Sequence, residues 1–179
     1  MRLYVAAYPP APWCTLALHG AEKFIPDKVR VTASEQLHIT LVFIGTVRAA
    51  QLTETFESVE RAAAGMRAIE VAPTRYCTLP RGAGPRLLAL EFAAAPMLME
   101  LQRRLAARLA KANERGREFL PHATIARLDP RGSAPEVAAP APHHLGPTTI
   151  DGVVLMASVL SGRGARHEVL HRVALGTER

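Results

Sequence analysis

The sequence has few cysteines and no long apolar run. Its two cysteines, Cys14 and Cys77, are too few for a disulfide framework, and neither has a partner at the C-x-x-C spacing of a zinc site. No apolar run approaches the ~18 residues that a membrane-spanning helix needs, and the apolar stretch 3–7 is too short for a signal-peptide core. We therefore expect a cytoplasmic protein with reduced thiols and no membrane contact.

Lysine is also scarce. Only three of the 22 basic residues are lysines, 19 are arginines, and the net charge is +6. The planar guanidinium group suits phosphate oxygens, so a small arginine-rich protein often binds polyanions, although a solvated basic surface has the same composition. With 49% apolar and 21% charged residues the chain has a globular balance. Its length predicts one domain that covers residues 1–179.

No glycine-rich phosphate loop follows any predicted strand. Periodicity predicts helices at 11–21, 52–66 and 98–112, and strands at 2–8, 37–45, 68–71, 86–92, 120–128, 148–160 and 167–175. This order favours an α+β fold over a doubly wound nucleotide-binding fold. One face of the third helix carries four basic side chains, which we interpret as a solvated face: Arg104, Arg108, Lys111 and Arg115.

Two strand-like segments share a histidine followed two residues later by a threonine. One is His38–Thr40 within LHITL, and the other is His122–Thr124 within PHATI. The two motifs lie nearly half the chain apart, and each follows a strand and a helix. This spacing indicates a weak internal duplication with one motif in each of two lobes.

Strand geometry gives these motifs a chemical meaning. Residues i and i+2 of a strand point to the same face, so each histidine projects together with its threonine. If a pseudo-twofold axis relates the lobes, the two pairs face each other across a cleft. One imidazole can then act as general base and the other as general acid, and the threonine hydroxyls can donate to phosphoryl oxygens. The alternative for each histidine alone is a structural role in its strand.

In these motifs the chain resembles the 2H phosphoesterases, which are defined by two H-x-[ST] motifs in a bilobal, pseudo-twofold fold. Three segments are similar to the branch of RNA 2′,3′-cyclic phosphodiesterases, also called 2′-5′ RNA ligases: RLYVA (2–6), LHITLVFIG (37–45) and FLPHATIAR (119–127). The chain departs from this branch near its end. There GARH (164–167) occupies a region that commonly holds a tyrosine.

The resemblance implies a function as well as a fold. The fold is α+β with two lobes, each an antiparallel sheet with outer helices, and the active site lies in the cleft between them. The activity is hydrolysis of RNA 2′,3′-cyclic phosphate to a 2′-phosphomonoester, with reversible 2′-5′ RNA ligation, without metal or cofactor. His38 and His122 are the expected catalytic residues, with the acid and base roles open. We expect a monomer whose partner is RNA or a nucleotide with a cyclic phosphate end.

Two further residues are implied as substrate contacts. By the resemblance, Arg127 binds the phosphate or the nucleotide, and Phe43 contacts the base, alongside Thr40 and Thr124. Phe43 and Arg127 each lie five residues after a motif histidine, so strict alternation would place both on the opposite face. A bulge or a strand end is needed to bring them in. The alternative for Phe43 is a core position, whereas burial of an unpaired arginine is unfavourable.

Other functions remain open at this point. One is a 2H enzyme that acts on another cyclic phosphate or on a 2′-5′ oligonucleotide, and another is a non-catalytic RNA-binding module that uses the arginines. A metal site is not expected. The pair His143-His144 has no Asp, Glu or Cys at ligand spacing, and His167 and His171 would share a face only on a helix.

Overall fold

The computed structural model describes residues 1–27, 29–82, 84–111, 118–129, 136–161 and 164–176. Its helices are α1 (Ala11–Ala21), α2 (Leu52–Ala63) and α3 (Pro96–Leu109), with short 3₁₀ turns η1 (Glu22–Phe24), η2 (Ser34–Gln36) and η3 (Ala49–Gln51). Its strands are β1 (Arg2–Ala7), β2 (Arg30–Val31), β3 (Ile39–Thr46), β4 (Ile69–Val71), β5 (Pro73–Leu79), β6 (Leu87–Phe92), β7 (His122–Arg127), β8 (Ala138–Pro140), β9 (Thr148–Ile150), β10 (Gly152–Ser161) and β11 (Gly164–Ala174).

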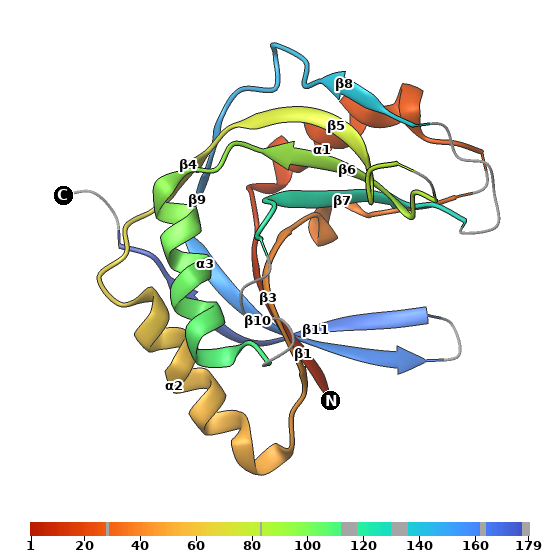
Figure 1. Ribbon diagram of the computed structural model, residues 1–179. Helices are drawn as coiled ribbons and strands as arrows, with labels where there is room; N and C mark the ends of the chain where they lie inside the picture. Colours follow the sequence, from red (N-terminus) through yellow and green to blue (C-terminus); the bar gives the residue numbers. More distant parts are fainter. Residues whose placement is uncertain (28, 83, 112–117, 130–135, 162–163, 177–179) are drawn as a thin grey trace.

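The strand order is symmetrical about the contact between β3 and β7 (Figure 1). In the described part of the chain the nine-stranded sheet runs β11-β10-β1-β3-β7-β6-β5-β8, with β2 beside β7. All pairs in it are antiparallel. The unit β1–α1–β3 is repeated by β6–α3–β7, and the second strand of each unit carries a motif. The α+β fold with two antiparallel lobes is therefore confirmed.

The helices cover the face of the sheet that does not carry the motifs. On the β5–β6 side, the Tyr76 hydroxyl donates to the Ala17 carbonyl of α1 at 2.8 Å, and Trp13 stacks on Phe92 at 5.8 Å. On the other side, α3 packs against α2 and β3. Its apolar stripe is fully buried: Leu98, Leu101 and Leu105. The helices thus support the two motif strands from behind.

Several sequence predictions need correction. The second helix ends at Ala63 rather than at residue 66, and the third ends at Leu109 rather than at residue 112. Arg115 of the basic stripe lies outside the described residues. Strand β5 was not predicted, because its opening proline reads as a turn signal, and the short strands β2 and β8 were not predicted either. The predicted strand 148–160 is two strands, β9 and β10, because the first pairs with β4 and the second pairs with β1 and β11.

The two thiols are buried and unpaired, as the sequence predicted. Burial raises the pKa of Cys14 to about 11 and, together with the neighbouring Glu91 carboxylate, that of Cys77 to about 12. Both groups are therefore protonated at neutral pH. None of the helices in the described ranges is long and apolar enough to cross a bilayer.

Candidate active site

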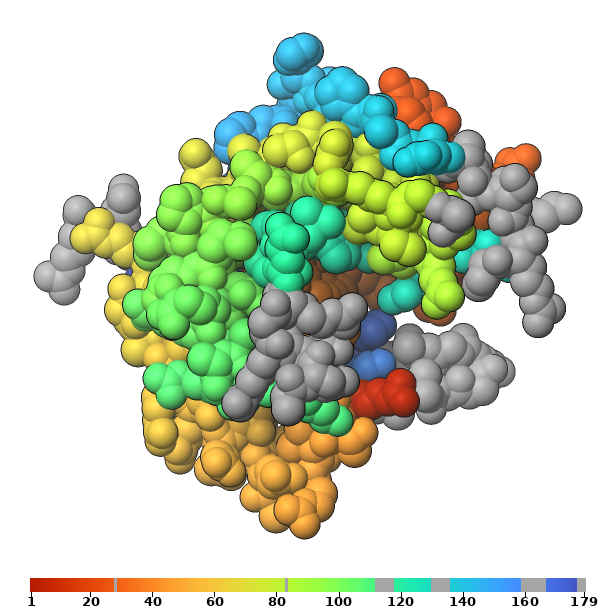
Figure 2. Space-filling view, in the orientation of Figure 1, coloured from red at the N-terminus to blue at the C-terminus, as the bar shows by residue number. Residues whose placement is uncertain are grey.

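The two histidine motifs meet where β3 and β7 touch. Ile39 lies directly opposite Ala123 in this antiparallel pair, and both are buried. Ile39 and Ala123 each lie between a motif histidine and its threonine. Because side chains alternate along a strand, both histidines and both threonines point to the face opposite that of Ile39 and Ala123. These four line one cleft of about 1280 Å³: His38, Thr40, His122 and Thr124. Figure 2 shows the surface hollowed beside the teal residues of β7.

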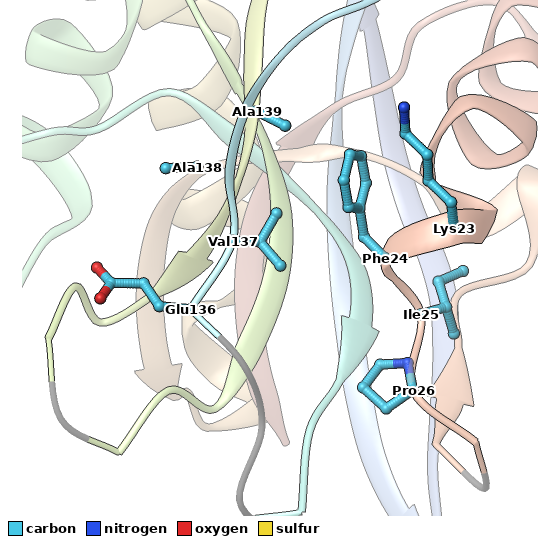
Figure 3. Close-up of a pocket in the computed structure, with 8 residues that line it drawn as sticks. All are labelled: Lys23, Phe24, Ile25, Pro26, Glu136, Val137, Ala138 and Ala139. Carbon is cyan, nitrogen blue, oxygen red and sulfur yellow. The ribbon is translucent and has the colours of Figure 1, made fainter.

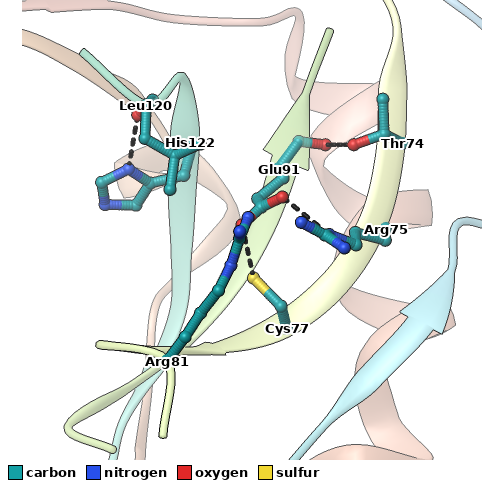
Figure 4. Close-up of polar contacts among 7 residues, drawn as sticks. All are labelled: Thr74, Arg75, Cys77, Arg81, Glu91, Leu120 and His122. Carbon is teal, nitrogen blue, oxygen red and sulfur yellow. Dashed lines mark hydrogen bonds and ion pairs between the residues drawn. The ribbon is translucent and has the colours of Figure 1, made fainter. Parts of the chain in front are cut away.

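Both imidazoles are held in the same way. Nδ1 of His38 donates to the Gln36 carbonyl at 2.6 Å, and Nδ1 of His122 donates to the Leu120 carbonyl at 2.9 Å (Figure 4). A carbonyl oxygen only accepts, so Nδ1 carries the proton in each ring. The atom left for chemistry is Nε2, which has a lone pair in the neutral ring and a proton in the charged one. Each histidine can therefore serve as base or as acid.

Each motif strand also has a bulge at the same position. The register between β1 and β3 skips Leu41, and the register between β6 and β7 skips Ile125. Both residues are third after their histidine, and each is followed by a second buried residue, Val42 or Ala126. A bulge changes the phase of the alternation, so the side chains beyond it exchange faces.

The bulges bring the two remaining predicted residues into the cleft. Phe43 and Arg127 both line it. The Phe43 side chain is 62% exposed, so the alternative of a core position is wrong. Its ring lies 6.2 Å from that of Tyr4. Arg127 is exposed, and no carboxylate of the described residues lies within ion-pair distance of it.

Two tyrosines that the sequence analysis missed pack on His38. The Tyr4 ring stacks on the imidazole at 5.5 Å, and the Tyr8 ring lies at 5.2 Å. The Tyr4 hydroxyl is also 2.8 Å from Nδ1 of His167 in β11. The available signal was spacing: residues 4 and 8 share a face of a strand, next to the strand that carries the first motif. His167 lies in the region where the branch commonly has tyrosine.

These surroundings make His38 less basic than an ordinary histidine. Burial lowers its pKa most, and the positive charges of Arg127 and of His167 and His122 when protonated lower it further, although the hydrogen bond to Gln36 acts in the opposite direction. His38 is therefore neutral at neutral pH in the free protein.

A buried carboxylate lies beside His122. Glu91 is directly opposite His122 in the β6–β7 pair and only 4% exposed. Its carboxylate accepts from Arg75 Nε and Arg81 Nη2, both at 2.7 Å, and from Cys77 Sγ at 3.1 Å (Figure 4). Burial alone would raise the pKa of Glu91, but these hydrogen bonds hold it below the usual value. The two guanidinium groups therefore more than balance the negative charge of Glu91 beside His122.

Other features of the molecule lie apart from the motifs. A second cavity of about 450 Å³ lies between residues 23–26 and 136–139, and no motif residue lines it (Figure 3). Nε2 of His171 donates to the Glu60 carboxylate at 2.9 Å, and the imidazole stacks on Phe56 at 5.1 Å. Among the described residues, no group of three or more His, Cys, Asp and Glu is arranged to hold a metal ion.

Known proteins share the fold of this chain. The family model of the 2′-5′ RNA ligase superfamily matches residues 9–159, and no curated protein matches the chain. E. coli LigT complexed with NADP+ has a TM-score of 0.80 at 24% identity over 98% of this chain and 97% of that chain. The protein TT0787 of Thermus thermophilus has a TM-score of 0.76 at 22% identity over 100% of both chains.

A further solved structure, described as a phosphoesterase, has a TM-score of 0.82 at 23% identity over 98% of both chains. At this identity the solved structures establish the fold, and the family model establishes the membership. The chain belongs to the 2′-5′ RNA ligase superfamily, the 2H phosphoesterases, which are enzymes of phosphodiester chemistry.

Proposed function

We propose that the protein hydrolyses RNA 2′,3′-cyclic phosphates to 2′-phosphomonoesters. The observation that carries this proposal is the pair of imidazoles in one cleft, each with Nδ1 bound to a carbonyl and with no hydrogen-bond partner for Nε2 among the described residues. Two such groups, at the starts of two neighbouring strands, suit a substitution at phosphorus in which one proton is removed and another is supplied.

The reaction needs one proton transfer at each end of the phosphorus. One neutral imidazole accepts the proton of a water molecule at Nε2 while the water oxygen bonds to phosphorus. The P–O3′ bond breaks, and the leaving O3′ takes the Nε2 proton of the other, charged imidazole. When a 5′-hydroxyl rather than water attacks the cyclic phosphate, the same displacement of O3′ gives a 2′-5′ linkage, and attack of the 3′-hydroxyl on that linkage is the reverse step. One site thus accounts for both hydrolysis and ligation.

The walls of the cleft suit an anionic substrate. Thr40 and Thr124 lie on the same face as the histidines and can donate to the phosphoryl oxygens, where charge increases in the transition state. Two glutamates line the cleft, Glu35 and Glu118, against four arginines: Arg2, Arg30, Arg127 and Arg172. Such an excess of positive charge attracts phosphate and speeds its association.

Phe43 supplies the apolar part of the binding site. Its exposed ring lies in the cleft beside Tyr4, and an aromatic ring at such a position stacks on any nucleobase. A nucleotide with a cyclic phosphate end therefore meets an aromatic ring and a cationic group in one cleft. We further propose a monomer that acts in the cytoplasm, where both thiols stay reduced.

The proposed scheme has no step for a metal ion, because the imidazoles transfer the protons and the Thr40 and Thr124 hydroxyls, in a cleft with excess positive charge, stabilise the reacting phosphate. Activity should therefore persist in EDTA. Reproducible inactivation by EDTA that a divalent ion reverses would contradict the scheme.

The decisive experiment replaces each motif histidine. His38→Ala and His122→Ala should each lower kcat for a cyclic mononucleotide by about 10²–10⁴-fold. The double variant should be little worse, since the two groups act in one transition state. His19→Ala is the matched control, because His19 is an exposed histidine that pairs with Glu22 away from the cleft. Near-normal turnover in either motif variant would overturn the proposal.

Two assays separate the alternatives. A panel of cyclic mononucleotides, other cyclic phosphates and 2′-5′ oligonucleotides identifies the preferred phosphodiester. If the wild type binds RNA but none of these substrates turns over, the protein is a binding module rather than a hydrolase.

A further inference from the structure

Two arginines of the cleft lie directly opposite each other on neighbouring strands. Arg30 of β2 pairs with Arg127 at the end of β7, and both line the cleft. Like charges in this arrangement repel and destabilise a sheet. No carboxylate of the described residues lies within ion-pair distance of either guanidinium group. An anion that lies between or beside the two groups would relieve this repulsion.

A histidine from the other lobe reaches the same place. His167 of β11 lines the cleft, and its Nδ1 is 2.8 Å from the Tyr4 hydroxyl. Loss of solvent lowers its pKa most, and the positive charges of Arg127 and Arg30 lower it further, so the three groups are close enough to interact. When the Tyr4 hydroxyl donates to Nδ1, the neutral ring carries its proton on Nε2, which can donate to an anion.

The backbone of Arg127 is well separated from that of His122. Arg127 follows His122 by five residues, a strand length of roughly 16 Å at ~3.3 Å per residue. His167 is linked to His38 through Tyr4, whose ring stacks on the His38 imidazole at 5.5 Å and whose hydroxyl is 2.8 Å from Nδ1 of His167. The three residues therefore extend the cleft from the histidine pair toward the far end of β7.

We propose that Arg30, Arg127 and His167 form a second anion subsite, which binds the phosphate on the 5′ side of the nucleotide that carries the cyclic phosphate. This inference rests on the proposed function and gives it a substrate preference. The enzyme acts best on a nucleotide that has a phosphate at its 5′ oxygen, as at the end of an RNA strand. A cyclic mononucleotide with a free 5′-hydroxyl leaves the subsite empty.

The test compares three substrates with one terminal base: a cyclic mononucleotide with a 5′-hydroxyl, the same nucleotide with a 5′-phosphate, and a dinucleotide with the cyclic end. For the wild type, kcat/KM should be about tenfold higher for the second and third than for the first, as expected for one charged hydrogen-bonded contact. Arg30→Gln should remove most of this ratio, and Arg30→Lys should retain part of it. His167→Gln should lower the ratio by less.

The matched control is Arg108→Gln, since Arg108 is an exposed arginine of α3 that does not line the cleft. It should leave the ratio unchanged. Salt provides a second measurement: the dependence of log kcat/KM on log salt should be steeper for the two 5′-phosphorylated substrates, and Arg30→Gln should reduce that slope by about one.

Several outcomes would overturn the inference. One is a wild-type ratio near one, and another is an equal loss on all three substrates in Arg30→Gln. A gain for the dinucleotide but not for the 5′-phosphorylated mononucleotide would show that the preceding nucleoside, not its phosphate, is recognised. In each case the enzyme still hydrolyses the simplest substrate, so the proposed function stands. If no substrate turns over, it is the proposed function that fails.

Discussion

Ile39 and Ala123, which directly follow the two motif histidines, lie opposite each other where β3 and β7 meet. The two lobes are equivalent around this pair, even in individual hydrogen bonds and in the position of a bulge. Each histidine donates to the carbonyl two residues before it, and each strand has a bulge three residues after its histidine. Five residues after each histidine the lobes differ, because β3 has Phe43 and β7 has Arg127. The symmetrical scaffold thus presents an aromatic ring and a cation to one cleft.

The leaving group can distinguish the catalytic acid from the base. In an aryl phosphodiester the leaving group p-nitrophenolate departs without protonation, so loss of the catalytic acid has little effect on its hydrolysis. One of the two variants, His38→Ala or His122→Ala, should therefore recover activity on this substrate relative to the cyclic nucleotide, and the other should not. The measurement is the ratio of kcat/KM on the two substrates.

The control for this comparison is the wild type with both substrates, which sets the ratio for intact chemistry. If both variants are equally impaired on both substrates, the histidines bind the phosphate rather than transfer protons. If both recover equally, each transfers a proton to the leaving group in part of the turnovers.

The second prediction concerns the pH dependence of His38. Its pKa in the folded protein lies below the ordinary value of 6.5 because of burial and nearby positive charge. Between these two values the unfolded chain binds more protons, so the free energy of unfolding falls as the pH falls through this window. Arg127→Gln removes one of the charges and should raise the His38 pKa. NMR titration of the His38 ring, assigned with His38→Gln, measures the His38 pKa in the wild type and in Arg127→Gln. Chemical denaturation across the same pH range measures the free energy of unfolding.

Arg127 stays charged across this range, so its loss should shift a limb of the pH profile of kcat/KM without removing the bell shape. The limbs belong to the coupled pair of histidines and are not assigned to either ring. A His38 titration at or above 6.5 in the wild type would contradict the prediction. A single sigmoidal profile would contradict the paired acid and base.

Motif spacing and strand alternation were enough to predict which side chains of the two motifs share the cleft. His38 and His122 with their threonines needed only the period of a strand to share a face. Phe43 and Arg127 could not be placed in this way, because a bulge is a property of the pairing with β1 and β6 and leaves no mark in the local pattern. The tyrosines around His38 and the pair Arg30–Arg127 depend on contacts between strands that are distant in the chain.

The third prediction tests the shape of the Arg127 side chain. Arg127→Ala should lower kcat/KM, and Arg127→Lys should restore only part of it, because a point charge lacks the planar fork that binds two phosphate oxygens. The melting temperature should change little, since this exposed side chain has no ion pair among the described residues. Full rescue by lysine would show that charge alone is needed.

The last prediction concerns Phe43. Phe43→Ala should raise KM for a cyclic mononucleotide by about tenfold, within the ~1–3 kcal/mol that stacking of one base contributes, whereas Phe43→Tyr should keep the wild-type value. Because the ring is 62% exposed, neither change should lower the melting temperature noticeably. Leu16→Ala is the matched control, as Leu16 is an exposed apolar residue of α1 outside the cleft.

A second substrate, ribose 2′,3′-cyclic phosphate without the base, separates stacking from other roles of Phe43. The measurement is KM on this substrate and on the nucleotide. Phe43→Ala should affect this substrate far less than the nucleotide, because the ring has no base to contact. An equal loss on both substrates would contradict the stacking role and would instead indicate that the ring positions Tyr4 beside His38, since the Phe43 and Tyr4 rings are 6.2 Å apart. A drop of several degrees in melting temperature would show that the ring supports the fold.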